Sequence, residues 1–348
     1  MRTALIVGGT GVVGWALRER LEETQGWRVL SLSRRAPPGI AADTFVGVDL
    51  FDRDALADAR DKLRDVTHVF ITLRVPANTP EEEVRNNVLP LENLMSALAV
   101  AGAPLERVCL IHGTKWYGCH QGPFATPAKE HHPRKSFEHY YYAQHDLITR
   151  LQQGQAWSWV SLRPHTVWGR SQGTGNSIVA ALGVYATLLK AHGRPLDFPG
   201  PVDTWSKLSQ GVTAELLARA MEWAAVSSQC ANQDFNITNG DSFRWQYLWP
   251  EIAKFFDMPA GEVVPQALSQ TMADEGKTWS AIAKKNTLRE ADLERLVSWP
   301  YLDSLLQPTW DDLSSVIKAR QFGFEPSADS ETAFLACLEN LRRDHVIP

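Results

Sequence analysis

Short apolar runs alternate with amphipathic stretches along the first 165 residues. Residues 81–103, for example, begin with three consecutive glutamates and end near Gly102, as a helix that uses its dipole and a glycine stop does. The apolar runs have the length and β-branched content of parallel strands buried on both faces. They lie at residues 4–9, 28–33, 44–50, 68–73, 107–113 and 158–164. This alternation predicts βαβ units and an α/β fold of the Rossmann type, with a doubly wound parallel sheet.

The pattern changes in the second half, where helical stretches dominate. Residues 212–225 and about 329–343 have the spacing of amphipathic helices, and residues 265–303 are mostly helical with aromatic interruptions. We expect two domains: residues 1–165 form a dinucleotide-binding Rossmann domain, and residues 166–348 form a smaller, mostly helical lobe for the substrate. Some strands and helices of the second part should return to the Rossmann core.

Charge and hydropathy limit the partners and the location. The formal net charge is -5 and there is no basic run, which argues against nucleic acid and anionic membranes as partners. No apolar stretch approaches the roughly 18 to 20 residues that span a bilayer, and the chain starts with a strand rather than a secretory leader. We therefore expect a cytoplasmic protein with a small-molecule substrate. A homodimer is left open.

Neither the cysteines nor the histidines have the spacing of a metal site. His120, His131 and His132 lack the i, i+4 pairing of zinc ligands borne by a helix. The four cysteines form no CxxC pair; they are Cys109, Cys119, Cys230 and Cys337. We expect reduced thiols and no metal.

A glycine motif follows the first predicted strand. In GGTGVVG, Gly8, Gly11 and Gly14 stand where a strand turns into a helix. In that context the glycines allow a tight turn, close approach of the backbone to a pyrophosphate and close packing of helix on strand. We predict that this segment binds the phosphates of a dinucleotide through Gly8, Thr10, Gly11, Val12, Val13 and Gly14. An ordinary tight turn is the alternative interpretation.

The ends of the next strands favour NADPH as the cofactor. Where an NAD enzyme usually has an acid, this chain has Ser33, Arg34 and Arg35, and guanidinium groups bind a 2′-phosphate well. Asp49, beside Leu50, is either an acceptor for the adenine amine or a cap of the strand end. The predicted crevice is completed by residues after the fourth and sixth strands, namely Leu73, Pro164 and Val167.

Two segments carry the candidate chemistry. Lys115 follows the fifth strand, at the edge of the sheet where ligands of open α/β folds collect. Three tyrosines open a helix about twenty-five residues later. A tyrosine there is the usual acid of short-chain dehydrogenases, yet the position four after Tyr141 is His145 instead of lysine. Lys115 could supply the missing ammonium from its loop. A surface lysine and simple aromatic packing are the alternatives.

At these two segments the sequence resembles the progesterone 5β-reductase and iridoid synthase-like (PRISE) enone reductases, which belong to the extended short-chain dehydrogenase group. Their Thr-Gly-x-Lys-His-Tyr-x-Gly-Pro pattern is similar to residues 112–117 followed by Gly122 and Pro123. Their Asn-Phe-Tyr-Tyr-x-x-Glu-Asp pattern is similar to residues 139–146, and places the catalytic tyrosine at Tyr141. The similarity continues over residues 157–169, over residues 235–249 and to the final VIP, so it extends over nearly the whole chain.

The resemblance implies a reaction and a pocket. NADPH would deliver hydride to the β-carbon of an α,β-unsaturated ketone or aldehyde, while Tyr141 and Lys115 stabilise the enolate oxygen. Reduction of the carbonyl itself, or cofactor sensing without turnover, are the alternatives. Differences from the family at Trp116, at His139 and Tyr140, and at Thr166 leave the substrate open. The expected pocket residues are Trp116, Tyr117, Thr166, Ser209 and Tyr301.

Overall fold

The computed structural model describes residues 1–36, 39–170 and 176–348. Its centre is a seven-stranded sheet with the order β10-β6-β5-β4-β1-β2-β3, and all neighbouring strands run parallel. The strands are β1 (Arg2–Val7), β2 (Trp27–Ser33), β3 (Phe45–Gly47), β4 (His68–Ile71), β5 (Arg107–Ile111), β6 (Ser158–Pro164) and β10 (Gln233–Ile237). The strand order reverses between β1 and β4, as in a doubly wound Rossmann sheet. The predicted fold class is confirmed.

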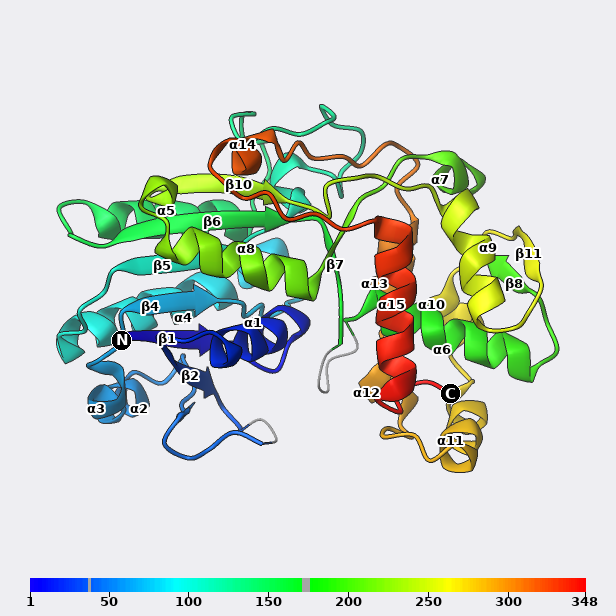
Figure 1. Cartoon of the computed structure of the whole chain (residues 1–348), viewed down its shortest axis with the longest axis horizontal. Helices are drawn as coiled ribbons and strands as arrows, with labels where there is room; N and C mark the ends of the chain where they lie inside the picture. The colour runs from blue at the N-terminus through cyan, green and yellow to red at the C-terminus, as the bar shows by residue number, and fades with distance from the viewer. Residues whose placement is uncertain (37–38, 171–175) are drawn as a thin grey trace.

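Helices cover both faces of the sheet because alternate residues of each strand point to opposite sides. Ala4 and Ile6 of β1 pack with helices α1 (Val12–Glu23) and α8 (Ala214–Val226). Leu5 and Val7 pack on the other face. That face is covered by α2 (Arg53–Asp58), α3 (Arg60–Leu63), α4 (Pro80–Ala101) and α5 (Tyr140–Gln152). Each face of the central strand is thus buried under its own helical layer (Figure 1).

Helix α4 shows how local sequence sets these elements. The Thr79 side chain accepts a hydrogen bond from the amide of Glu82, and Pro80 occupies the first turn, where its missing N–H has no cost. The helix ends at Gly102, whose φ of 69° is left-handed and suits glycine. The helix agrees closely with the predicted one.

Several strands end earlier than predicted. β1 ends at Val7 instead of residue 9, and β5 ends at Ile111 instead of residue 113. At β1 the reason is Gly8, whose φ of 93° turns the chain out of the sheet. The residues released from the strand ends form the loops at the carboxyl edge, where a ligand of this fold binds.

The second lobe, at the right of Figure 1, surrounds helix α6 (Ile178–Ala191), which is buried over almost its entire length. Its larger helices are α9 (Trp245–Phe255), α11 (Gly276–Lys285), α13 (Trp299–Leu306) and α15 (Ser330–Arg343). Short elements complete it: α7 (Val202–Ser206), α10 (Leu268–Thr271), α12 (Leu293–Leu296), and the pair β8 (Leu196–Phe198) and β11 (Ala260–Val263). Its apolar core includes five tryptophans: Trp168, Trp245, Trp249, Trp279 and Trp299.

The chain crosses between the two parts more than once. The pair β7 (Thr166–Trp168) and β9 (Gly211–Thr213) lies at the junction. The chain then returns through α8 and β10, and β10 becomes the outermost strand beside β6. Helix α14 (Ile317–Gln321) packs beside β10. Within the described ranges, no helix combines the length and the apolar character that crossing a membrane requires.

Candidate active site

The fold itself requires two glycines here, Gly8 in the turn after β1 and Gly14 in the first turn of α1. Gly8 has a left-handed φ of 93°, and a Cβ there would lie 2.9 Å from the backbone nitrogen of Leu73. A Cβ at Gly14 would lie 2.4 Å from the Gly8 carbonyl oxygen. The Thr72 hydroxyl donates to the Val7 carbonyl at 2.8 Å and so binds the end of β4 to this turn. These glycines are explained by packing alone.

Gly11 is different, because no described part of the chain requires a glycine there. Its φ of -73° suits any residue, and a Cβ would meet only the Gly8 carbonyl oxygen, at an ordinary 3.6 Å. Gly11 precedes α1, whose first turn has no side-chain cap and no acidic residue. The amides of Val12 and Val13 at the positive end of the helix dipole therefore have the room and the charge to bind an anion. Thr10 lies in the same turn.

The residues predicted for the adenosine end lie at the carboxyl ends of β2 and β3. The Ser33 hydroxyl donates to the Arg35 carbonyl at 2.7 Å. Arg34 and Arg35 are exposed, and neither forms an ion pair with a described residue. Asp49 acts as a cap of the turn, because one carboxylate oxygen accepts the Phe51 amide at 3.0 Å. Leu50 is buried, and Leu73 lies against Gly8.

Tyr141 places its hydroxyl at the carboxyl ends of β5 and β6. A Cβ added to Gly113, just after β5, would lie 3.1 Å from this hydroxyl and 3.6 Å from the carbonyl oxygen of Pro164, which ends β6. The Tyr141 ring is enclosed by His139, Tyr140 and His112, with centroids 4.3, 4.5 and 4.9 Å away. Burial raises the pKa of Tyr141, although contact with Tyr140 and the Arg74 charge offset part of the effect.

Burial distinguishes Tyr141 from the two tyrosines beside it. Tyr140 is 5% exposed and Tyr142 is 7% exposed, whereas Tyr141 is only partly buried. The Tyr142 hydroxyl donates to the Trp116 carbonyl at 2.5 Å. Of the three side chains, that of Tyr141 thus has the largest exposed fraction.

Lys115 lies in the short 3-10 turn η1 (Thr114–Tyr117) directly after β5. It is partly buried, and its amine makes no hydrogen bond or ion pair with the residues that the structure describes. Burial and then the Arg74 charge lower the pKa of Lys115, while Glu83 opposes them. The Lys115 charge also helps to lower the pKa of His139 to about 3, after burial and His120. His139 also contacts the Tyr141 ring, with centroids 4.3 Å apart.

Sequence analysis missed an ion pair at the edge of this site. Arg74, in the loop after β4, donates through Nε to Glu83 of α4 at 2.9 Å and contacts the same carboxylate through Nη2 at 2.8 Å. Its charge acts on the pKa of Lys115, Tyr141 and Tyr301. The only signal in the sequence was the position of Arg74 after a strand, at the same edge as Lys115 and Tyr141.

The residues predicted for the substrate pocket lie in different surroundings. Tyr301 of α13 lies near the site: burial raises its pKa to about 12, with smaller effects from Arg74 and Tyr141. Ser209 is held in a backbone bridge to Phe243, with both hydrogen bonds at 2.9 Å. Thr166 and Val167 are partly buried in β7, beside Pro164.

Trp116 and Tyr117 are buried in this structure, and their place in a substrate pocket stays a prediction. They are 4% and 3% exposed and pack with Ala128 and Tyr142. The reason is the buried guanidinium of Arg163, which lies 3.8 Å from the Trp116 ring centroid and donates to the Tyr117 hydroxyl at 3.0 Å.

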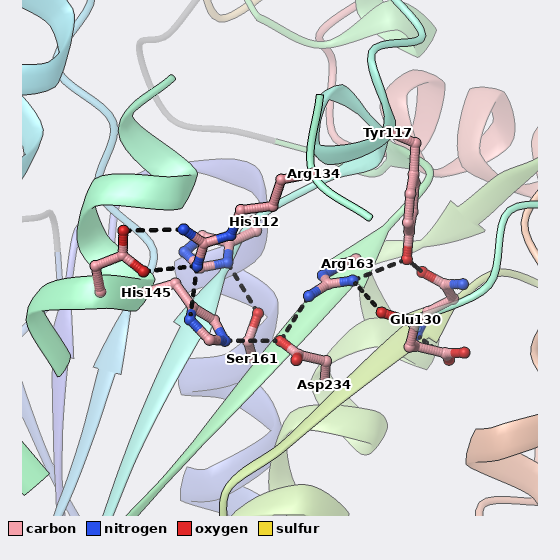
Figure 2. A network of polar contacts seen from close by, with 10 residues as sticks. His112, Tyr117, Glu130, Arg134, His145, Ser161, Arg163 and Asp234 are labelled. Carbon is pink, nitrogen blue, oxygen red and sulfur yellow. Dashed lines mark hydrogen bonds and ion pairs between the residues drawn. The ribbon is translucent and has the colours of Figure 1, made fainter. Parts of the chain in front are cut away.

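His145, at the position of the expected helical lysine, belongs to a polar network shown in Figure 2. Its Nε2 lies 3.5 Å from Asp234, and its Nδ1 lies 3.1 Å from Arg134. Asp234 pairs with Arg163 at 2.8 Å. Burial opposes ionisation of Asp234, but contact with His145 and the Arg163 charge outweigh it and lower the pKa of this carboxyl to about 2. Among the residues described, no group of His, Cys, Asp and Glu is arranged to hold a metal ion.

Comparison with known proteins agrees with this arrangement. A family model described as a PRISE-like Rossmann-fold domain matches residues 42–348. The (S)-8-oxocitronellyl enol synthase of Nepeta cataria is 31% identical to this chain over 366 residues, which cover 99% of this chain and 93% of the synthase. The 3-oxo-Delta(4,5)-steroid 5-beta-reductase of Arabidopsis thaliana is 30% identical over 364 residues, with the same two shares.

Solved structures with the same fold are more distant in sequence. The UDP-glucose 4-epimerase of Thermus thermophilus, in complex with NAD, gives a TM-score of 0.68 at 20% identity and covers 98% of this chain and 99% of its own. RMD from Pseudomonas aeruginosa, complexed with NADPH, gives 0.68 at 16% identity and covers 99% of each chain. Fold and relatives define an oxidoreductase of the short-chain dehydrogenase type. The chain belongs to the PRISE-like Rossmann-fold family.

Proposed function

We propose that this enzyme uses NADPH to reduce the C=C bond of α,β-unsaturated ketones or aldehydes. The observation that carries the proposal is the place of the Tyr141 hydroxyl, beside Gly113 and Pro164 at the carboxyl edge of the sheet. Lys115 belongs to η1, which begins at the residue after Gly113. Two of the curated relatives are named as an enol synthase and a steroid 5-beta-reductase, and such names fit a reaction that passes through an enolate.

The residues present fit a bound dinucleotide. The start of α1, with its room at Gly11, would hold the pyrophosphate, and the exposed pair Arg34 and Arg35 would bind a 2′-phosphate. The absence of an acid at the end of β2 removes the group that would repel that phosphate. When bound, NADPH supplies the hydride that is added to the β-carbon of the substrate.

The protein side of the reaction is stabilisation of charge on the substrate carbonyl oxygen. Tyr141 donates a hydrogen bond to this oxygen as it becomes an enolate, and the Lys115 ammonium places positive charge beside it. Both residues are partly buried, and such contacts are stronger in a partly buried site than in water. The raised pKa of Tyr141 keeps its phenol protonated at neutral pH. Solvent then protonates the α-carbon.

The test is turnover of a small enone. Purified enzyme should oxidise NADPH in the presence of 2-cyclohexenone, and mass spectrometry with NMR should identify the saturated ketone. An allylic alcohol would instead indicate 1,2-reduction of the carbonyl. No turnover with any of a panel of enones and enals, in spite of NADPH binding, would indicate a cofactor-sensing protein and contradict the proposal.

The tyrosine assignment has its own variant. Tyr141→Phe should lower kcat by about 10² to 10³, the usual cost of losing one oxyanion donor, while NADPH still binds. Tyr185→Phe is the matched control, because Tyr185 is also buried and its hydroxyl donates to a backbone carbonyl in the second lobe, that of Asp197 at 3.0 Å. Equal kcat in Tyr141→Phe and the parent enzyme would refute the assignment.

A further inference from the structure

Arg163 of β6 is a charged residue in the interior of the protein. Its exposed fraction is 1%, and burying a guanidinium costs several kcal/mol unless it is paired and hydrogen-bonded. The charge is balanced by Asp234 of β10 at 2.8 Å. Its other contacts all go to one segment, which begins at η1 and continues to Glu130. A buried arginine with this distribution of partners holds that segment against the sheet.

Three contacts make this attachment, and Figure 2 shows the two hydrogen bonds among them. The guanidinium carbon lies 3.8 Å from the Trp116 ring centroid. One nitrogen, Nη1, donates to the Tyr117 hydroxyl at 3.0 Å and to the Glu130 carbonyl at 3.3 Å. The Tyr117 hydroxyl in turn donates to Asn236 of β10 at 2.6 Å. The two residues that follow Lys115 are therefore bound to β6 and to β10.

The Lys115 amine has no partner of its own that could fix its place within the described chain. The turn that carries it is closed by hydrogen bonds from the Trp116 amide to the Gly113 carbonyl at 2.9 Å and from the Gly118 amide to the Lys115 carbonyl at 3.0 Å. Tyr142 binds the same turn from α5. The position of the ammonium thus depends on the residues next to it.

We propose that Arg163 is a positioning residue for Lys115, which fixes η1 by stacking on Trp116 and donating to Tyr117 so that the ammonium lies beside the Tyr141 hydroxyl. The inference rests on the proposed function. It also gives His145 a role: through Asp234 this residue supports Arg163, and Arg163 supports the lysine of the loop. Position 145, which carries a lysine in typical short-chain dehydrogenases, would thus still act on the ammonium, but indirectly, through Asp234 and Arg163.

A double-mutant cycle on kcat tests whether Arg163 acts through Lys115. Misplacement of a catalytic group by about 1 Å can cost about 10² in rate, so Arg163→Met should lower kcat tenfold or more while the Kd for NADPH changes little. In a Lys115→Met background the same substitution should cost less than about twofold, because the group it positions is gone. Equal losses in both backgrounds would overturn the inference.

Arg107→Met is the matched control for this cycle. Arg107 is also a buried arginine, 6% exposed, but it begins β5 at the far end of the strand and donates to the carbonyls of Ala224 and Ser227, both at 3.0 Å. Its effect on kcat should be the same with and without Lys115. If Arg163→Met does not fold, Tyr117→Phe removes only one hydroxyl from the attachment, and it should lower kcat severalfold with the same dependence on Lys115.

A second readout needs no turnover and so separates the two proposals. Amide hydrogen exchange of residues 113–118 should be at least tenfold faster in Arg163→Met or Tyr117→Phe than in the parent, and unchanged in Arg107→Met. Unchanged exchange in all variants would refute positioning by Arg163 even if the enzyme reduces enones. Full activity of Lys115→Met would refute the proposed role of the lysine, while faster exchange would still show that Arg163 fixes the turn.

Discussion

The Tyr141 hydroxyl lies against the backbone of Gly113, so that a single added carbon at Gly113 would approach it to 3.1 Å. The φ of Gly113 is -178°, an extended conformation that any residue adopts. Glycine is therefore needed there only to leave space for the phenol.

The first prediction follows from this contact. Gly113→Ala should displace the Tyr141 hydroxyl and lower kcat at least tenfold, because catalytic hydrogen bonds depend on position within a fraction of an ångström. Gly276→Ala is the control, since a Cβ at Gly276 meets nothing within 4 Å. Steady-state kinetics with 2-cyclohexenone measure both. An unchanged kcat in Gly113→Ala would show that the phenol is not held there.

Substitutions of Gly14 and Gly11, at the start of α1, should have separate effects on stability and on cofactor binding. Gly14→Ala brings a Cβ within 2.4 Å of the Gly8 carbonyl oxygen and should lower the free energy of unfolding by about 1 to 3 kcal/mol. Gly11→Ala should change it by less than about 0.5 kcal/mol and raise the Kd for NADPH tenfold or more. Urea unfolding and fluorescence titration distinguish the two. Tight NADPH binding by Gly11→Ala would contradict the anion site at α1.

The pair Arg34 and Arg35 should determine the choice between the two dinucleotides. Because a hydrogen bond to a charged group contributes about 1.5 to 3 kcal/mol, replacing both by alanine should raise the Kd for NADPH at least tenfold and leave the Kd for NADH nearly unchanged. Arg28→Ala, within β2 itself and 3.8 Å from Asp65, is the control. Similar losses for NADH and NADPH would show that these arginines do not bind a 2′-phosphate.

The pH dependence of kcat/KM should report the charge on Lys115. Burial and Arg74 place the pKa of this amine below its usual 10.5, and burial places the pKa of Tyr141 above 10.0. Because the ammonium loses its proton as pH rises through this lowered pKa, kcat/KM should fall at a pH below 10.5. Lys115→Arg keeps its charge, so its alkaline decline should move to higher pH. The same decline in both enzymes would exclude Lys115 as its cause.

Stability should decrease in mild acid because of His68. This residue is 1% exposed, and burial, followed by the charges of Arg2 and Arg107, lowers its pKa from 6.5 to about 4. Between these values the unfolded chain binds a proton that the folded protein does not, so stability is full above pH 6.5 and falls toward pH 4. His68 contributes about 3 kcal/mol to this loss. Urea titrations at pH 6.5 and pH 4 measure this fall in the free energy of unfolding. The fall should be smaller in His68→Gln than in the parent, whereas substitution of the exposed His131 should leave it unchanged.

The fold was predictable because its central strands are buried on both faces and most strands are followed by a helix with its own signals. The small pairs β7–β9 and β8–β11 were not predicted as sheets. Their strands have three or four residues, and pairing over such lengths is decided by tertiary contacts rather than by a local pattern.

The site was predictable only where chemistry and position coincide in the sequence. Lys115 lies just after a strand and Tyr141 lies at the start of a helix, so the residue type and its position in the fold could be interpreted together. Arg74 could not be found this way, because nothing in its loop shows that it pairs with Glu83, which the helix dipole already explained. The burial of Trp116 and Tyr117 was not predicted either, because it depends on Arg163, an arginine in a strand whose own burial no local pattern reveals.

The last strand of the central sheet comes from residues 233–237, long after the chain has entered the second lobe. During synthesis β6 therefore remains without its outer neighbour until this distant segment leaves the ribosome. An open strand edge invites pairing with other chains. A ribosome that stalls between residues 165 and 233 would hence release a product prone to aggregation, and any shortened version of this enzyme needs β10 to be complete.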